Sequence, residues 1–411
     1  MKSTLTAVAL AMGLFAATPA FALQATAQPA PTPERKLNIS NEARKALVEL
    51  QTAVSANDVA NIPAKIAAAQ AVAKSADDKY FIARIQLRLA VASQNEAAIA
   101  TAVEAVLASG GAEPAQVPLL HLMRGKVHYN AKQYDQAIAS FQKSLAADPS
   151  NTEALTLMAE AQKATGRGGD ALGALQSQIR TSVAAGRKPA EEVYKRALAL
   201  AFEAKSPAAI EIGRQWVSDY PSATSWSDAL RVYRRVARPD EQTLLDTLRL
   251  ARATGALSGD ADYHIYAYTA ADSGAAGEAK SVIEEATAAG KLDPNKALFR
   301  EINQALKTKA TAADRSSLEA RAKSALGDSA AKVAVRVGDV HYGYGEYGKA
   351  AELYRAALGK SGADADLINL HLGMALARAG DKAGALAALQ QVKGSRAELA
   401  KYWQVYASSR S

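Results

Sequence analysis

Four arginines near the middle of the chain form the clearest binding pattern in the sequence. They stand at i, i+3, i+4 and i+7, as Arg231, Arg234, Arg235 and Arg238. On an α-helix this spacing places all four on one face. Guanidinium groups bind carboxylates and phosphates through paired, charge-assisted hydrogen bonds. Two interpretations are therefore open: docking of an acidic partner on this face, or internal pairing with neighbours such as Asp228, Asp240 and Glu241.

The sequence contains no pattern that predicts catalysis. Its histidines lack the close spacing of a metal site, no serine lies in a G-x-S-x-G motif, and no sequence cue pairs two carboxylates for acid–base work. We expect no catalytic residue, no metal and no cofactor, and therefore a protein that is not an enzyme. An enzyme within residues 186–259 stays open as an alternative, and it requires that segment to fold differently from a helix pair.

Cysteine usage and charge restrict the classes of partner. The chain has no cysteine, which excludes disulfides, thiolate metal sites and cysteine nucleophiles. It has 49 Lys and Arg against 41 Asp and Glu, a net charge of +8. A modest basic excess attracts polyanions in general. Because the N-terminus predicts export, we expect an acidic protein or an anionic glycan as a partner, and no nucleic acid.

The N-terminal 22 residues have the layout of a secretory signal peptide. Lys2 precedes an apolar run from about Leu5 to Ala17, and small residues lead to Ala22. The apolar run is shorter than the roughly 20 residues that span a bilayer, and no later charge-free stretch is as long. We expect cleavage after Ala22, a periplasmic location and no transmembrane segment in the mature chain. Loss of Lys2 lowers the net charge to 48 − 41 = +7.

Internal repeats account for the size of the chain. In residues 118–151 a set of small and large residues stands at fixed offsets, and the set recurs 34 residues later and again near the C-terminus. The sets are Gly125, Ala137, Phe141, Ser144 and Pro149; Ala159, Ala171 and Leu175; Gly338, Ala350 and Tyr354; and Gly373, Ala385 and Leu389. Small residues let two helices approach closely, a large residue fills the gap, and proline ends the second helix. The pattern resembles the tetratricopeptide repeat.

The resemblance identifies the chain as an exported bacterial member of that family and implies an all-α fold. We expect an α-solenoid of antiparallel helix pairs with a C-terminal capping helix. The predicted segments are a signal peptide (1–22), a flexible Pro- and Ala-rich linker (23–39), degenerate repeats (40–117), two clear repeats (118–185), degenerate repeats (186–330), two clear repeats (331–399) and the end of the capping helix with the tail (400–411).

The same register decides how a glycine-rich segment is interpreted. Residues 343–348 read G-Y-G-E-Y-G, a formal match to the dinucleotide-binding fingerprint. The repeat register places them at the end of one helix and in the turn that follows. We therefore expect no nucleotide at this segment.

In this family, residues on the concave side of the repeats contact partner peptides. The resemblance implies one set at Leu119, Leu122, Lys126, Tyr129 and Asn130, and another at Lys332, Val335, Asp339 and Tyr342. Tyr129 and Tyr342 occupy matching positions, where contact with a partner and packing between helices are both open. Only Lys126 and Asn130 suit the clamp with which some cytosolic members hold a C-terminal carboxylate, so recognition of chaperone tails is not expected.

Two functions are consistent with these features. The first is a periplasmic scaffold or adaptor that mediates protein–protein interaction in the cell envelope by holding an envelope protein or peptide. The second is a component of envelope polysaccharide synthesis or export that binds an anionic glycan. A stoichiometric protein partner favours the first function, and saturable glycan binding without such a partner favours the second.

Overall fold

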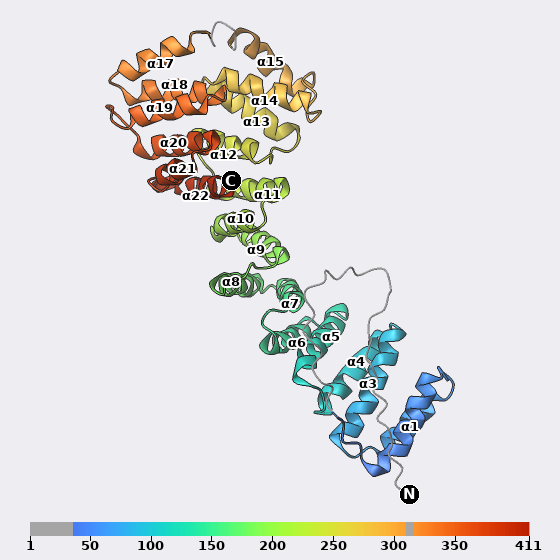
Figure 1. Ribbon diagram of the computed structural model, residues 1–411. Helices are drawn as coiled ribbons and strands as arrows, with labels where there is room; N and C mark the ends of the chain where they lie inside the picture. Colours follow the sequence, from blue (N-terminus) through green and yellow to red (C-terminus); the bar gives the residue numbers. More distant parts are fainter. Residues whose placement is uncertain (1–35, 310–315, 411) are drawn as a thin grey trace. The chain divides into compact units, whose positions relative to one another are not determined.

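The computed structural model describes residues 36–309 and 316–410 (Figure 1). The predicted signal peptide and most of the predicted linker lie outside these residues. All regular elements that are described are helical, and the one β-bridge among them is an isolated pair between Ala330 and Ser361. The prediction of an all-α solenoid of helix pairs is therefore confirmed. The chain divides into two compact units, one up to Ile82 and one from Ala83 onward.

The first unit contains α1 (Asn41–Ser55), α2 (Ile62–Val72) and the start of α3 (Ala76–Ala92). Ser40 is the N-cap of α1, and its side chain accepts a hydrogen bond from the backbone N–H of Ala43. Asp78 accepts hydrogen bonds from the backbone N–H and the hydroxyl of Ser40, at 2.9 and 2.7 Å. These bonds favour the ionised carboxylate and hold the pKa of Asp78 well below its usual range, although burial acts to raise it. The start of α1 is thereby tied to α3.

The second unit continues from α3 through a series of helices. They are α4 (Glu96–Ala108), α5 (Val117–Asn130), α6 (Tyr134–Ala147), α7 (Thr152–Ala164), α8 (Gly168–Ala184), α9 (Glu191–Glu203), α10 (Ala208–Asp219), α11 (Ala223–Ala237), α12 (Glu241–Ala253), α13 (Gly259–Asp272), α14 (Ala276–Ala288), α15 (Ala297–Lys309), α17 (Leu318–Gly327), α18 (Ala331–Gly343), α19 (Tyr347–Ala357), α20 (Ala365–Ala379), α21 (Lys382–Leu389) and α22 (Ala397–Ser409), with short 3-10 turns at Pro114–Gln116 and Gly394–Arg396. Residues 186–259 form α9 to α12, so this segment does not have the different fold that the enzyme alternative requires.

The repeat pattern works through glycines that meet large side chains. A Cβ atom on Gly125 would lie 2.4 Å from the ring of Phe141, which is impossible without displacing it. Glycine at this position therefore lets α5 and α6 pack closely. Gly338 stands in the same relation to Tyr354, where an added Cβ would lie 2.7 Å from the ring. These two matching contacts agree with the prediction that a small residue of the repeat lets the paired helices approach closely and a large residue fills the gap.

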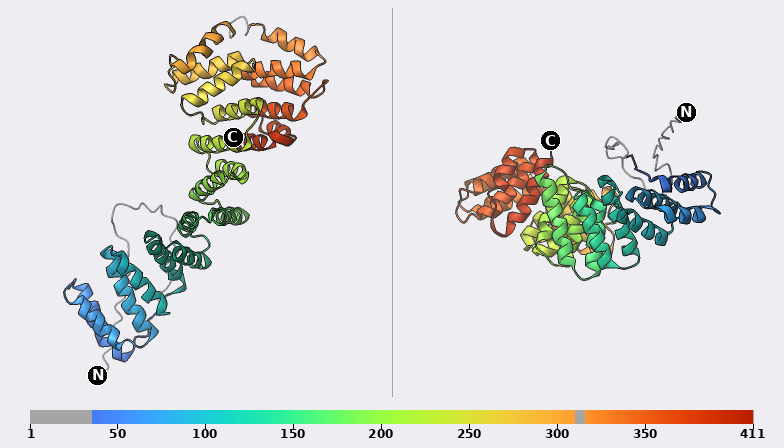
Figure 2. Two further views of the ribbon diagram at one scale, coloured as in Figure 1. Left: turned by 180° about the vertical axis from the view of Figure 1, so that it is seen from behind. Right: turned by 90° about the horizontal axis from the view of Figure 1, so that it is seen from below.

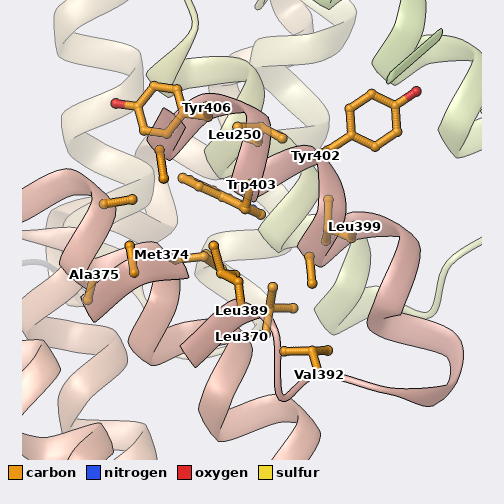
Figure 3. Packing of buried hydrophobic residues seen from close by; sticks show 14 of the residues in the cluster. Leu250, Leu370, Met374, Ala375, Leu389, Val392, Leu399, Tyr402, Trp403 and Tyr406 are labelled. Carbon is orange, nitrogen blue, oxygen red and sulfur yellow. The ribbon is translucent and has the colours of Figure 1, made fainter. Parts of the chain in front are cut away.

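The C-terminal helix does more than cover the last repeat. Besides α20 and α21, α22 packs against α10 and α12. The hydroxyl of Tyr402 donates a 2.8 Å hydrogen bond to the backbone carbonyl of Ile210, which is 192 positions earlier. Trp403 is fully buried among Leu250, Met374 and other apolar side chains (Figure 3). The chain therefore folds back on itself, and from behind α12 to α15 lie beside α17 to α22 (Figure 2).

A buried arginine on α12 contacts residues of α14 and α18 within this folded-back region. Arg249 on α12 is 2% exposed and donates to both carboxylate oxygens of Glu278 on α14, at 3.0 and 2.8 Å. It also donates to Asp246, at 2.9 Å. Its guanidinium lies 4.9 Å from the ring centre of Tyr342 on α18. Tyr266 on α13 donates to Glu278 at 2.7 Å, so the cluster connects α12, α13, α14 and α18.

A buried histidine extends the same cluster to α20. Nε2 of His371 lies 3.0 Å from Asp246, and Nδ1 lies 3.0 Å from Asp339 on α18. Tyr354 donates a 2.8 Å hydrogen bond to Asp339. Burial acts to lower the pKa of His371, but attraction to the two carboxylates outweighs it and raises the pKa to about 10. The histidine is therefore a buried cation at neutral pH.

The fold-back predicts opposite effects of the same substitution at two helical glycines. A Cβ on Gly213 in α10 would lie 2.7 Å from the hydroxyl of Tyr402 and 3.2 Å from Ala229, whereas a Cβ on Gly173 in α8 meets nothing within 4 Å. We expect Gly213→Ala to lower the free energy of unfolding by about 1–3 kcal/mol through overpacking. Gly173→Ala should raise it by about 0.5–1 kcal/mol through helix propensity. Urea denaturation checks both, and stabilisation by Gly213→Ala would contradict the packing of α22 on α10.

The histidine predicts a pH dependence of stability with a definite sign. Its pKa is higher in the folded state, about 10, than the value of about 6.5 expected in the unfolded chain. Its stabilisation is therefore complete below about pH 6.5 and is lost as the pH rises toward about 10, at no more than about 1.4 kcal/mol per pH unit. Urea denaturation across this range should show the loss for the natural chain and a flatter curve for His371→Gln. Identical slopes for the two proteins would contradict the charged histidine.

Candidate ligand-binding surface

The first helices of successive repeats, α5, α7 and α9, pack against one another along one side of the second unit (Figure 1). Three predicted contact residues lie on α5 and face acidic side chains of adjacent helices. Lys126 pairs with Glu153 of α7 at 2.8 Å, and the Tyr129 hydroxyl donates to Glu160 of α7 at 3.0 Å. The structure therefore brings these predicted residues together on one polar face.

This polar face continues from α5 to α9 and back to α4. The Asn130 amide donates to Glu96 of α4 at 2.7 Å. Glu160 also pairs with Arg196 of α9, and Lys163 pairs with Glu203 at 2.7 Å. Ion pairs in such exposed positions contribute only about 0–1 kcal/mol each. The charges can therefore be exchanged for those of a partner at little cost in stability.

Two predicted contact residues, one on α5 and one on α18, are buried. Leu122 is 6% exposed, because its side chain packs in the core formed by α5 to α10 with residues such as Phe141. Tyr342 is also 6% exposed, because Arg249 covers one side of its ring and the edge of Tyr347 lies 5.2 Å away. Their assignment as contact residues is corrected by this burial. Leu119 remains exposed at 54%.

The arginines predicted to share one helix face fall into two groups. Helix α11 ends at Ala237, and Arg238 is its C-cap with a left-handed backbone at φ 48°. Arg238 therefore does not belong to the helical stripe, which corrects the expectation of four arginines on one helix face. Arg231 pairs with Asp228 three residues earlier, and Arg234 pairs with Asp262 of α13 at 2.9 Å.

The remaining arginines, Arg235 and Arg238, have no carboxylate partner among the described residues. Asp240 does not supply one, because its side chain caps α12 by accepting from the backbone N–H of Thr243 at 2.7 Å. Internal pairing thus accounts for Arg231 and Arg234. Arg235 and Arg238 carry exposed positive charge.

A groove lies between α9, α10 and α11, beside these arginines. Its volume is about 430 Å³, and its floor is apolar, formed by Leu198, Ala199, Phe202, Trp216 and Val232. The rim carries Lys195, Asp228, Arg231 and Arg235. Phe202 is 41% exposed, an unusual position for a large apolar residue. The arrangement can hold an apolar side chain between cationic groups.

Phe202 is not among the contact residues predicted from the sequence. Residues 186–259 match the repeat pattern poorly, so no register was available to place Phe202 on the open side of α9. An apolar residue among exposed neighbours, in the segment Phe202-Glu203-Ala204-Lys205, was the only local signal.

The described residues were also compared with the requirements of other kinds of site. No group of three or more His, Asp or Glu side chains within residues 36–309 and 316–410 is arranged to hold a metal ion. None of the described helices is long and apolar enough to cross a membrane. Gly343 ends α18, and Tyr347 begins α19. The glycine-rich segment therefore forms a helix end and a turn, as the repeat register predicts.

Comparisons with known proteins give limited overall similarity. No curated protein matches the sequence. Solved structures that match include a tetratricopeptide repeat protein from Parabacteroides merdae, with 12% identity and a TM-score of 0.28 over 72% of this chain and 99% of that chain. The APC/C hetero-tetramer Cut9–Hcn1 matches with 12% identity and a TM-score of 0.20 over 85% and 86%. Naa15/Naa10 bound to HypK matches with 15% identity and a TM-score of 0.27 over 87% and 64%.

Sequence profiles of a known repeat match both regions in which the repeats are clearest. One tetratricopeptide repeat profile matches residues 129–181, and a second matches residues 87–152 and 336–399. These stretches contain the glycine-to-aromatic contacts of α5 with α6 and of α18 with α19. Tetratricopeptide domains bind protein partners, and most serve as scaffolds without catalytic activity. These matches show that the all-helical chain carries tetratricopeptide repeats in residues 87–181 and 336–399.

Proposed function

We propose that the protein is an exported scaffold of the cell envelope that holds an acidic, amphipathic segment of an envelope protein in the groove between α9, α10 and α11. The observation that carries the proposal is the exposed Phe202 on an apolar floor, with Arg231 and Arg235 on the rim. The family supplies the general role of protein binding. The groove supplies the chemistry of the partner.

The size and lining of the groove define what it binds. About 430 Å³ lies in the range of sites that hold small ligands or a few side chains. An amphipathic helix placed in such a groove offers apolar residues at i and i+4, and acidic residues beside them would face the arginines. Arg235 lacks an internal carboxylate partner among the described residues, so a partner's carboxylate would neutralise it without breaking an existing pair.

Export and the absence of catalysis are parts of the same proposal. The N-terminal sequence with Lys2, an apolar run and Ala22 supports cleavage and a periplasmic location. The family is typically non-catalytic, and the groove brings no nucleophile beside a general base. The protein would therefore act by positioning its partner rather than by converting it.

Site-specific photocrosslinking in intact cells tests the groove. A benzoylphenylalanine at position 202 should crosslink a stoichiometric protein partner, whose crosslinked peptide combines apolar and acidic residues. The same probe in place of Tyr268, an aromatic residue on α13 that is 58% exposed, should not capture this protein. Mass spectrometry of the crosslinked peptide identifies the partner and its contact segment. Equal capture from both positions, or capture of no protein at position 202, would contradict the proposal that the groove binds the partner.

Neutralisation of the arginines on the rim tests the electrostatic part of the proposal. We expect the double variant Arg231→Gln, Arg235→Gln to weaken binding of the crosslinked segment, made as a synthetic peptide, by about tenfold, or about 1.4 kcal/mol. The effect should shrink as salt concentration rises. Arg180→Gln on α8, an exposed arginine outside the groove, is the matched control. Equal affinity of all three proteins would show that the arginines do not contribute.

The N-terminus of the protein recovered from cells tests export. We expect the chain to begin at Leu23 and to be released with the periplasmic fraction, because the sequence before it has the three zones of a signal peptide. Intact-mass spectrometry after osmotic shock measures both. An uncleaved chain that stays with the cytoplasmic fraction would contradict the proposed location while leaving the groove open to the crosslinking test.

A further inference from the structure

A second, more polar pocket lies inside the folded-back region. Its volume is about 650 Å³, and it is lined by α12, α14, the turn between α18 and α19, α20 and α22. The pocket exists because α22 returns to the earlier helices, so it is absent from any single repeat. The volume lies within the range of sites that bind small molecules.

The pocket has an excess of positive charge. Its lining contains four cations, Arg252, Lys280, Arg378 and Arg410, and two carboxylates, Glu284 and Glu285, which gives 4 − 2 = +2. Both carboxylates already pair with cations of the same pocket. Nε of Arg252 donates to Glu285 at 3.0 Å, and Lys280 lies 3.9 Å from Glu284. The excess therefore belongs to Arg378 and Arg410.

Aromatic rings hold these two arginines in place. The guanidinium of Arg378 lies 4.7 Å from the ring centre of Tyr347, and that of Arg410 lies 5.5 Å from the ring centre of Tyr406. Neither arginine has a carboxylate partner among the described residues. One N–H of Arg410 donates to the Tyr406 hydroxyl at 2.7 Å. The other N–H groups of a guanidinium held against a ring stay at its edge, where they fit a planar carboxylate. The pocket thus presents fixed, unneutralised donors for an anion.

The rest of the lining favours a hydroxylated ligand over a peptide helix. It contains no Val, Leu, Ile, Met or Phe side chain, whereas grooves that hold amphipathic helices need apolar subsites. The Ser281 hydroxyl and the carboxylates of Glu284 and Glu285 offer hydrogen-bond acceptors beside the arginine donors. Alternating donors and acceptors suit the hydroxyl groups of a sugar.

Close contact between backbone and side chain keeps the pocket wall in its shape. A Cβ on Gly277 of α14 would lie 2.3 Å from the Tyr344 ring, and a Cβ on Gly343 would lie 2.7 Å from Glu278. Glycine is therefore required at both positions for α14 and the end of α18 to meet. Glu278 is the carboxylate that Arg249 binds, so the buried charge cluster lies directly behind this wall.

We propose that this pocket binds a short acidic oligosaccharide, with Arg378 binding a uronate carboxylate and Arg410 adding a second cationic contact. Ser281 and the glutamates would bind hydroxyl groups. This inference does not rest on the groove at Phe202, which is lined by other helices and has an apolar floor.

Calorimetric titration with trisaccharides of galacturonate, glucuronate and mannuronate tests the proposal on the full mature chain. At least one of the three should bind saturably, with about one site per chain, and neutral maltotriose should bind much more weakly. Arg378→Gln should weaken binding at least tenfold, and so should Arg410→Gln, which lies beyond the end of α22 and leaves the helices unaltered. Arg355→Gln, an exposed arginine on α19 outside the pocket, should bind like the natural chain.

Several results would overturn the proposal. These are no binding of any of the three acidic trisaccharides, equal weakening by Arg355→Gln, or full binding by both pocket variants. Tighter binding of triglutamate than of every uronate would show that the pocket holds an acidic peptide instead. None of these results changes the crosslinking outcome at position 202, so the two sites are tested separately.

Discussion

The buried ion pairs of Arg249 are the interaction on which the C-terminal half of the structure depends. The cluster holds three carboxylates, Asp246, Glu278 and Asp339, and two cations, Arg249 and His371. Removal of one member of such a buried pair leaves an uncompensated charge that costs about 3–5 kcal/mol. Its members come from α12, α14, α18 and α20, and residues of these four helices and of α22 line the polar pocket. A substitution in the cluster would therefore alter the shape of the pocket more than the packing of the repeats toward the N-terminus.

Helix α11 links the folded-back region to the apolar groove, because its two faces serve different neighbours. Tyr233 packs against Tyr402 of α22, with ring centres 5.8 Å apart, and Trp226 lies 6.2 Å from the same ring. Val232 and Arg235, on the other face, line the groove. Residues three and four apart along a helix share a face, so substitutions in the groove leave the stripe that contacts α22 intact. The groove can therefore be altered without loss of the fold-back.

Local spacing in the sequence predicted the paired helices, because their contacts join residues about one repeat apart. Gly125 and Phe141 are 16 positions apart, and their contact follows from spacing alone. The bond from Tyr402 to Ile210 spans 192 positions and has no local signature. Arg249 stands three residues after Asp246, which in sequence resembles an exposed ion pair, and only the packing of α14, α18 and α20 buries it. The position of Arg238 outside the helix could have been predicted from the sequence, because Pro239 disfavours helical backbone at the residue before it.

The matching tyrosines show how the fold-back divides binding between the two halves of the second unit. Tyr129 and Tyr342 share a repeat position, yet Tyr129 keeps its hydroxyl on the open face of α5 and α7, whereas Tyr342 is covered by Arg249. Helices α12 and α14 thus occupy the side of α18 that an extended peptide would use. A peptide can reach the faces of α5, α7 and α9 and the groove at α11. In the C-terminal repeats that face is occupied by their own chain. Their pocket is polar, which favours a hydroxylated ligand there, whereas the apolar floor of the groove favours a protein segment.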